Sequence, residues 1–185
     1  HGPEKMKKID MALSDTCCSR TVAGAPWVAS CLRRLWKNQI MFYVVRENQA
    51  FRFGPGPKKW SQAAVVIPTS LHNDTMRAYL RISVVEDDVP LLVSHRALTD
   101  LGAVLNLPKQ CIEMKSLEVM LPLISTLGGH VGFPIWNDTM MHDFLGDEEY
   151  VRQLCCHEDV EVMLVENPRT DGHREVTCEI GRAHV

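Results

Sequence analysis

The chain has 185 residues, of which 45% are hydrophobic and 23% are charged, so it is long enough for one globular domain with or without an appendage. The formal net charge of −3 gives no general basic surface, which argues against nucleic-acid binding by bulk electrostatics. No apolar run has the length of a membrane span. The seven cysteines, an odd number with two adjacent pairs, predict reduced thiols and therefore a cytoplasmic location.

The first sixty residues predict a strand, a turn, a helix and a hairpin. "MAL" at 11–13 is a strand candidate that runs into the polar turn "SDTCCSRTVAG" at 14–24. The helix is predicted over 25–39, because apolar residues recur there at spacings of three and four. Its inner stripe is Val28, Cys31, Leu32, Leu35 and Trp36. "FRFGPGPKKW" at 51–60 combines aromatic residues with glycine and proline and predicts a hairpin tip.

The middle of the chain predicts further strands and a short helix. "AAVVIP" is a strand closed by Pro68, and "HNDT" at 72–75 is a turn. Residues 77–86 alternate as a half-buried strand requires. The apolar face there is Ala78, Leu80, Ile82 and Val84, and the opposite face is Arg77, Tyr79, Arg81 and Ser83. "PLLVS" at 90–94 is a short apolar strand, followed by a helix over 95–102 with Ser94 as N-cap and Gly102 at its end.

Strands are also predicted in "AVLNL" (103–107), "LEVMLPL" (117–123) and "LGGHVGFPI" (127–135), which makes the body mainly β. From Trp136 onward acidic residues gather, and only 150–156 and 160–166 look ordered. We therefore expect a domain boundary near 136 and a solvated acidic linker or tail over 136–179, poorly defined in structure. The last residues, "IGRAHV" at 180–185, resemble the translation of a common sequencing adapter and are left out of the expected fold.

The order of these elements resembles the retropepsin-like aspartic proteases of LTR retrotransposon gag-pol polyproteins. "DTCCSRTVAG" after an apolar strand is similar to the family's active-site loop, and "FRFGPG" to its flap. "VVEDDVPLLVSHRALTDLGAVLNL" is similar to its second apolar strand, helix and next strand, and "GGHVGFPI" to its closing strand. The resemblance covers about residues 9–135. It implies that 1–135 form a small closed β-barrel-like acid protease lobe with one or two short helices.

The resemblance also implies a site and a reaction. Asp15 would be the catalytic residue, with Thr16 and Cys17 in the active-site loop. The implied flap is Phe53, Gly54, Pro55 and Gly56, and the implied second strand near the active site is Leu91, Leu92, Val93 and Ser94. One lobe supplies one aspartate, so the enzyme would be a homodimer whose two carboxyl groups share a proton. Its substrate would be a peptide or polyprotein, without metal or cofactor, in the cytoplasm or inside virus-like particles.

Cys17 departs from the family pattern, because glycine usually follows Asp-Thr. Glycine tolerates dihedral angles and close contacts that a residue with a Cβ does not. Ser14 likewise stands where an aliphatic residue is usual. A second hypothesis is therefore a catalytically inactive retropepsin-like module for dimerisation or peptide binding. A third is a small metal-binding β domain that uses "CCH" at 155–157 with His173 and Cys178.

Simpler interpretations stand beside these roles. Asp15 could be an ordinary turn aspartate that caps local backbone groups. A cysteine nucleophile at Cys17 or Cys18 would need a nearby base, which no sequence feature supplies. "NDTM" occurs at 73–76 and 137–140, but neither copy follows an apolar strand or precedes a small residue. We expect both copies to be turns.

Overall fold

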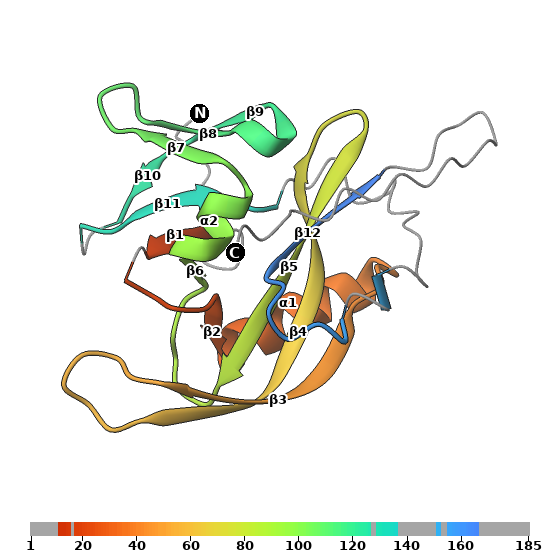
Figure 1. Ribbon diagram of the computed structural model, residues 1–185, viewed down its shortest axis with the longest axis vertical. Helices are drawn as coiled ribbons and strands as arrows, with labels where there is room; N and C mark the ends of the chain where they lie inside the picture. Colours follow the sequence, from red (N-terminus) through yellow and green to blue (C-terminus); the bar gives the residue numbers. More distant parts are fainter. Residues whose placement is uncertain (1–10, 16, 127–128, 137–150, 153–154, 167–185) are drawn as a thin grey trace, which may run out of the picture.

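The computed structural model describes residues 11–15, 17–126, 129–136, 151–152 and 155–166 (Figure 1). Within these ranges the chain is mainly β, with two α-helices, α1 (Ala25–Lys37) and α2 (His95–Asp100). The strands are β1 (Met11–Asp15), β2 (Val22–Gly24), β3 (Tyr43–Phe51), β4 (Lys59–His72), β5 (Met76–Val85), β6 (Leu92–Ser94), β7 (Ala103–Asn106), β8 (Cys111–Met114), β9 (Val119–Pro122), β10 (Ile124–Ser125), β11 (Val131–Pro134) and β12 (Val162–Glu166). None of the described helices is both long enough and apolar enough to cross a membrane.

Nine strands form one sheet in the order β10-β11-β1-β6-β2-β5-β4-β3, and β12 also pairs with β5. The sheet is mixed, because β1 runs parallel to β6 and β2 runs parallel to β5. Strands β7, β8 and β9 form a separate three-stranded sheet. Since β10 and β3 stand at the two ends of the strand order, the expected closure into a barrel is not found in the described part of the chain.

Helix α1 covers one face of the large sheet, and its apolar stripe joins the main core with residues of β4 and β5 (Figure 1). The stripe differs from the predicted one at its edges. Trp27 is buried, whereas Trp36 is 77% exposed. An α-helix turns about 100° per residue, so the step from Leu35 to Trp36 carries the indole away from the sheet.

Strands β4 and β5 make the longest hairpin of the fold, and β4 does not end at Pro68 as predicted. Pro68 pairs with Tyr79, and the register then shifts before His72 pairs with Arg77. Proline lacks an amide donor and is tolerated in sheets where the ladder is irregular. The turn at 73–75 that joins the two strands is as predicted: the Asn73 side chain accepts hydrogen bonds from the amides of Thr75 and Met76 at 2.9 and 2.7 Å.

The polar face of β5 is not solvated, so the prediction of a half-buried strand is wrong. Arg77, Tyr79, Arg81 and Ser83 are all buried. β12 pairs with β5 from Leu80 to Met76, and a second apolar cluster unites Val66, Tyr79, Val151, Cys155, Met163 and Val165. Within the segment predicted as an acidic tail, β12 is therefore a strand of the sheet, and Val151 and Cys155 pack on the face opposite α1. The domain boundary near 136 stays a prediction.

Candidate functional site

Asp15 is the last residue of β1 and is held between two neighbouring strands. On one side β1 pairs in parallel with β6, so that Asp15 lies opposite Ser94. The Leu13 amide donates to the Leu91 carbonyl at 2.8 Å. On the other side β1 pairs with β11, and the Ser14 hydroxyl donates to the Val131 carbonyl at 3.1 Å. A serine in place of an aliphatic residue at position 14 therefore has a hydrogen-bonding role in this fold.

The loop after Asp15 is organised by the aspartate itself. The Cys17 amide donates to Asp15 Oδ1 at 3.0 Å, and the Cys18 amide donates to the Asp15 carbonyl at 3.2 Å. This is the local capping expected of a turn aspartate. Thr16 lies outside the described residues. Cys17 is exposed and is not among the non-glycine residues with positive φ, so the backbone of a single chain does not require glycine at this position.

The Cys18 side chain turns inward from the same loop. It is partly buried, and its thiol donates to the Arg20 carbonyl at 2.8 Å. Burial raises the pKa of the Cys18 thiol, and the nearby carboxyl groups of Asp15 and Glu161 raise it further. A raised thiol pKa is the opposite of what a cysteine nucleophile needs.

The hairpin predicted at 51–60 is present between β3 and β4 and projects from the sheet (Figure 1). At its tip the Gly56 amide donates to the Phe53 carbonyl at 3.4 Å. Gly54 has a φ of 61°, and a Cβ there would meet open space. Further down, the rings of Phe51 and Phe53 stack with centroids 6.3 Å apart, so two aromatic rings stiffen the neck of the hairpin.

A small apolar cluster brings the hairpin, the Asp15 loop and β6 together. Phe51 is buried in it with Val22 and Val85, and the partly buried members are Cys18, Phe53, Val89 and Leu92. Of the other residues predicted in the second strand, Leu91, Val93 and Ser94 are fully buried, the first two within the main core. Three segments that the sequence assigned to one site thus meet in the fold, although Pro55 and Gly56 stay at the tip of the hairpin.

Gly24, the last residue of β2, packs against the segment that leads into β6. Its amide donates to the Val89 carbonyl at 2.8 Å. A Cβ at Gly24 would lie 2.0 Å from the Asp87 carbonyl oxygen and 2.5 Å from the Val89 nitrogen. Only glycine allows the strand after the Asp15 loop to come this close to the segment that leads into β6.

Sequence reasoning missed a buried acidic side chain at this site, Glu161. Its Oε1 accepts the Thr21 amide at 3.0 Å, and its Oε2 accepts the Ser94 hydroxyl. The Thr21 hydroxyl accepts the Ser94 amide at 3.2 Å, and Ser94 Oγ also accepts the Ala97 amide at 3.0 Å as the N-cap of α2. The signal was present in "VEVMLVE", whose alternation places Glu161 on the same face as Met163 and Val165.

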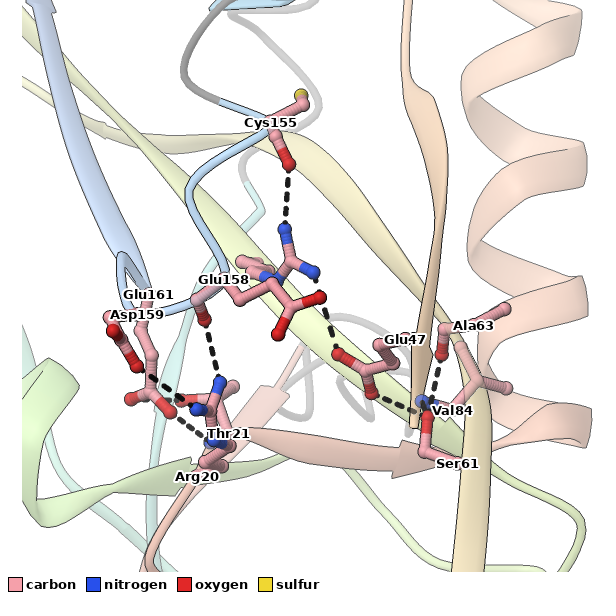
Figure 2. A network of polar contacts seen from close by, with 11 residues as sticks. Arg20, Thr21, Glu47, Ser61, Ala63, Val84, Cys155, Glu158, Asp159 and Glu161 are labelled. Atoms are coloured by element: carbon pink, nitrogen blue, oxygen red, sulfur yellow. Dashed lines mark hydrogen bonds and ion pairs between the residues drawn. The ribbon is translucent and has the colours of Figure 1, made fainter. Parts of the chain in front are cut away.

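Two arginines hold the segment that carries Glu161 (Figure 2). Arg20, in the Asp15 loop, donates to the Glu158 carbonyl at 2.6 Å and to Asp159 Oδ1 at 3.2 Å. Arg81 donates to the Cys155 carbonyl at 2.9 Å. Its guanidinium also lies 3.6 Å from Glu47 Oε2, in an ion pair with both side chains buried.

The remaining candidates do not join this site. In the described residues no three His, Cys, Asp or Glu side chains gather as a metal site would require, and His173 and Cys178 lie outside them. Asp74 is exposed in the turn between β4 and β5, and residues 137–140 lie outside the described residues. The metal hypothesis thus stays a prediction for its undescribed members.

Comparison of the chain with protein-family models, with curated proteins and with solved structures gave no match. Among the described residues, the site holds the carboxyl group of Asp15 at the end of a strand and that of Glu161, which is buried behind the neighbouring strand end. A single carboxyl group can exchange a proton with water or substrate, whereas a proton-sharing pair of loop aspartates needs a second copy of the chain.

Proposed function

We propose that the chain is an aspartic endopeptidase of the retropepsin-like kind, which acts as a homodimer and processes a retrotransposon polyprotein. The observation that carries the proposal is the parallel pairing of β1 with β6, which sets Asp15 opposite Ser94 at the strand ends. The neck of the glycine-containing hairpin packs beside the same loop. A carboxyl group on a short loop, next to a projecting hairpin, suits the cleavage of an extended peptide.

The mechanism follows from two Asp15 side chains facing each other across a two-fold axis. When two carboxyl groups lie so near each other, they cannot both ionise, so they share one proton. The pKa values then describe the pair and not either residue alone. The ionised member removes a proton from a water molecule, which attacks the scissile carbonyl carbon. The protonated member donates a hydrogen bond to the carbonyl oxygen, where negative charge develops. The leaving nitrogen takes up a proton as the carbon–nitrogen bond breaks.

The substrate would lie between the Asp15 loops and the hairpins. A peptide held in an extended conformation can add strand-like hydrogen bonds to a hairpin that closes over it. The stacked Phe51 and Phe53 rings support the hairpin at its neck, and the turn with Gly54 gives its tip conformational freedom. In this arrangement the hairpin would shield the scissile bond and the attacking water molecule from bulk solvent.

Cys17 favours a second candidate, a catalytically inactive module of the same fold that dimerises or binds peptides. Its side chain is exposed directly beside Asp15, on the surface that the second copy would approach. A Cβ and thiol there would separate the two loops, and a proton-sharing pair would then not form. Restoring the family residue with Cys17→Gly distinguishes the two functions. The variant should cleave faster than the natural chain if Cys17 only hinders the dimer.

The proposed activity is tested by incubating the purified chain with a peptide library between acidic and neutral pH. The expected result is cleavage that a pepstatin-type inhibitor blocks, with the chain sedimenting as a dimer. If the Cys17→Gly protein is a verified dimer and still cleaves nothing, the endopeptidase proposal is wrong and the inactive module stands.

A further inference from the structure

Two glutamates are buried in the described part of the chain, and they are satisfied in different ways. Glu47 forms an ion pair with Arg81. Glu161 is held by the Thr21 amide and the Ser94 hydroxyl, with no arginine or lysine in an ion pair with it among the described residues. We infer that Glu161 is a positioning residue for Asp15, and that segment 155–166 belongs to the working unit of the site. The catalytic part of this inference rests on the proposed function.

The two partners of Glu161 stand at the two ends of the Asp15 loop. Ser94 is the register partner of Asp15 in the β1–β6 pair, so it marks the point where the chain leaves β1. Thr21 directly precedes β2, where the chain enters the sheet again. One carboxyl group therefore joins both supports of the loop, and the contact between Thr21 Oγ1 and the Ser94 amide closes the connection. Moving either support would move Asp15.

The segment that delivers Glu161 is held independently of this contact. The Arg81 amide donates to the Glu161 carbonyl at 2.8 Å, and β12 continues directly along β5. Arg20 adds the contacts with Glu158 and Asp159 from within the loop itself. Because its backbone is fixed on β5, Glu161 can act as an anchor for the loop rather than follow the loop.

Burying a carboxyl group costs free energy, so the glutamate at position 161 needs a structural reason. A buried acidic side chain without hydrogen bonds is strongly unfavourable, and an apolar residue would suit the face shared with Met163 and Val165 better. Glu161 is 3% exposed, and it receives donors on both oxygens. Hydrogen bonds to an ionisable acceptor are stronger and more directional than apolar contacts. The side chain thus contributes a defined geometry at the loop supports, which an apolar side chain could not.

The test compares Glu161→Gln with Glu158→Gln in the full chain. Glutamine keeps the shape of Glu161 but replaces one of its two acceptor oxygens with an amide donor, so only one of the Thr21 and Ser94 donors keeps its acceptor. Glu158 is exposed on the same segment, and only its backbone carbonyl is used by Arg20, so the second variant controls for the loss of an acidic group. Glu161→Ala serves as a stronger perturbation. The primary readout is amide hydrogen exchange of 17–24 and 92–97, compared with β7 and β8.

If Glu161 positions the loop, Glu161→Gln raises exchange in 17–24 and 92–97 by about ten-fold or more, because one buried donor at the loop supports loses its acceptor. Exchange in β7 and β8 should stay unchanged, as should all exchange in Glu158→Gln. The second readout is peptide cleavage: kcat should fall by about ten- to a hundred-fold, with KM within about two-fold, since the catalytic geometry changes while the hairpin does not.

The exchange readout does not depend on protease activity, so the two proposals can fail separately. Unchanged exchange in Glu161→Gln and Glu161→Ala, or a rise spread evenly over the whole chain, overturns the positioning role whatever the activity. If the natural chain cleaves no peptide but exchange rises locally, the proposed function is wrong and the structural role of Glu161 holds. If kcat falls no further in Glu161→Gln than in Glu158→Gln, the catalytic part of the inference is wrong.

Discussion

Asp15 lies opposite Ser94 in the parallel β1–β6 pair, and the Ser94 hydroxyl in turn donates to the buried carboxyl group of Glu161. The same hydroxyl oxygen accepts the Ala97 amide and so begins α2. One serine therefore connects the strand neighbour of the candidate catalytic residue, the first turn of a helix and a segment nearly seventy residues further along the chain.

Ser94→Ala should destabilise the chain by about 2–3 kcal/mol. The substitution removes an N-cap, which is worth about 1 kcal/mol, and a hydrogen bond to a buried ionisable acceptor, worth about 2 kcal/mol. Urea unfolding measures the change. Ser30→Ala is the matched control, because Ser30 is partly exposed on α1 and its hydroxyl donates to the Pro26 carbonyl in the same helix. Equal midpoints for the two variants would contradict the role given to Ser94.

Gly24→Ala should destabilise the chain by about 3 kcal/mol or more, because the new Cβ would overlap the backbone at Asp87 and Val89. Gly54→Ala is the control. A Cβ at Gly54 meets nothing within 4 Å, so the cost there is the positive φ alone, about 1–2 kcal/mol. Thermal unfolding of the two variants checks the order. A Gly24→Ala protein as stable as Gly54→Ala would show that β2 and the 87–89 segment can separate at little cost.

The buried pair of Glu47 and Arg81 should show strong coupling. Glu47→Ala leaves the Arg81 guanidinium buried without its ion-pair partner, and we expect a loss of about 3–5 kcal/mol. Arg81→Met loses the pair and the contact with the Cys155 carbonyl. In a double-mutant cycle followed by urea unfolding, the double variant should lose at least about 1 kcal/mol less than the sum of the single losses. Additive losses would mean that the two side chains do not interact.

The two adjacent thiols should react at different rates. Cys17 is exposed, whereas burial and two nearby carboxyl groups raise the pKa of Cys18 above its ordinary value of 9.0. Iodoacetamide should therefore label Cys17 first, and Cys18 should follow only in more alkaline solution. Mass spectrometry of the labelled peptides measures both rates, with the exposed Cys156 as reference. Labelling of Cys18 as fast as Cys156 near neutral pH would contradict its burial.

The same pKa predicts a loss of stability in alkali. The folded chain holds the Cys18 proton more tightly than the unfolded chain does, so this contribution to stability is complete below about pH 9. It is lost as the pH rises through the raised pKa of the folded thiol. Urea unfolding at increasing pH should thus show a steeper alkaline decline for the natural chain than for Cys18→Ala.

Much of the fold was predictable because its signals are local. The alternation in 77–86 identified the inner face of β5, and the N-cap at Ser94 and the stop at Gly102 framed α2, where Gly102 has a φ of 63°. The predictions that were wrong concern residues whose burial depends on partners far away in the sequence. Arg77 and Arg81 look like a solvated face until β12 and Cys155 cover them, and β8 carried no distinct signal of its own. The end predicted at Pro68 failed because the β4–β5 register shifts there.

The residues of the candidate site likewise differ in how far the sequence alone predicts them. Asp15, the hairpin and β6 were recognisable from the order of short motifs. Glu161 was not, because its composition matches the other acidic residues of 136–179 and its partners Thr21 and Ser94 lie 140 and 67 residues away. A charged residue on the apolar face of an alternating strand is the one local sign that it is buried. Such a residue needs partners that only the fold supplies.

The central claim, that Asp15 carries the chemistry, is tested most directly by comparing Asp15→Asn with Asp74→Asn in peptide cleavage. Both variants convert the aspartate of an Asp-Thr pair to asparagine, but Asp74 lies exposed in the β4–β5 turn. We expect Asp15→Asn to lower kcat by about 100- to 10,000-fold, with an unchanged urea midpoint, and Asp74→Asn to cleave like the natural chain. Cleavage by Asp15→Asn at the natural rate would contradict the aspartic mechanism.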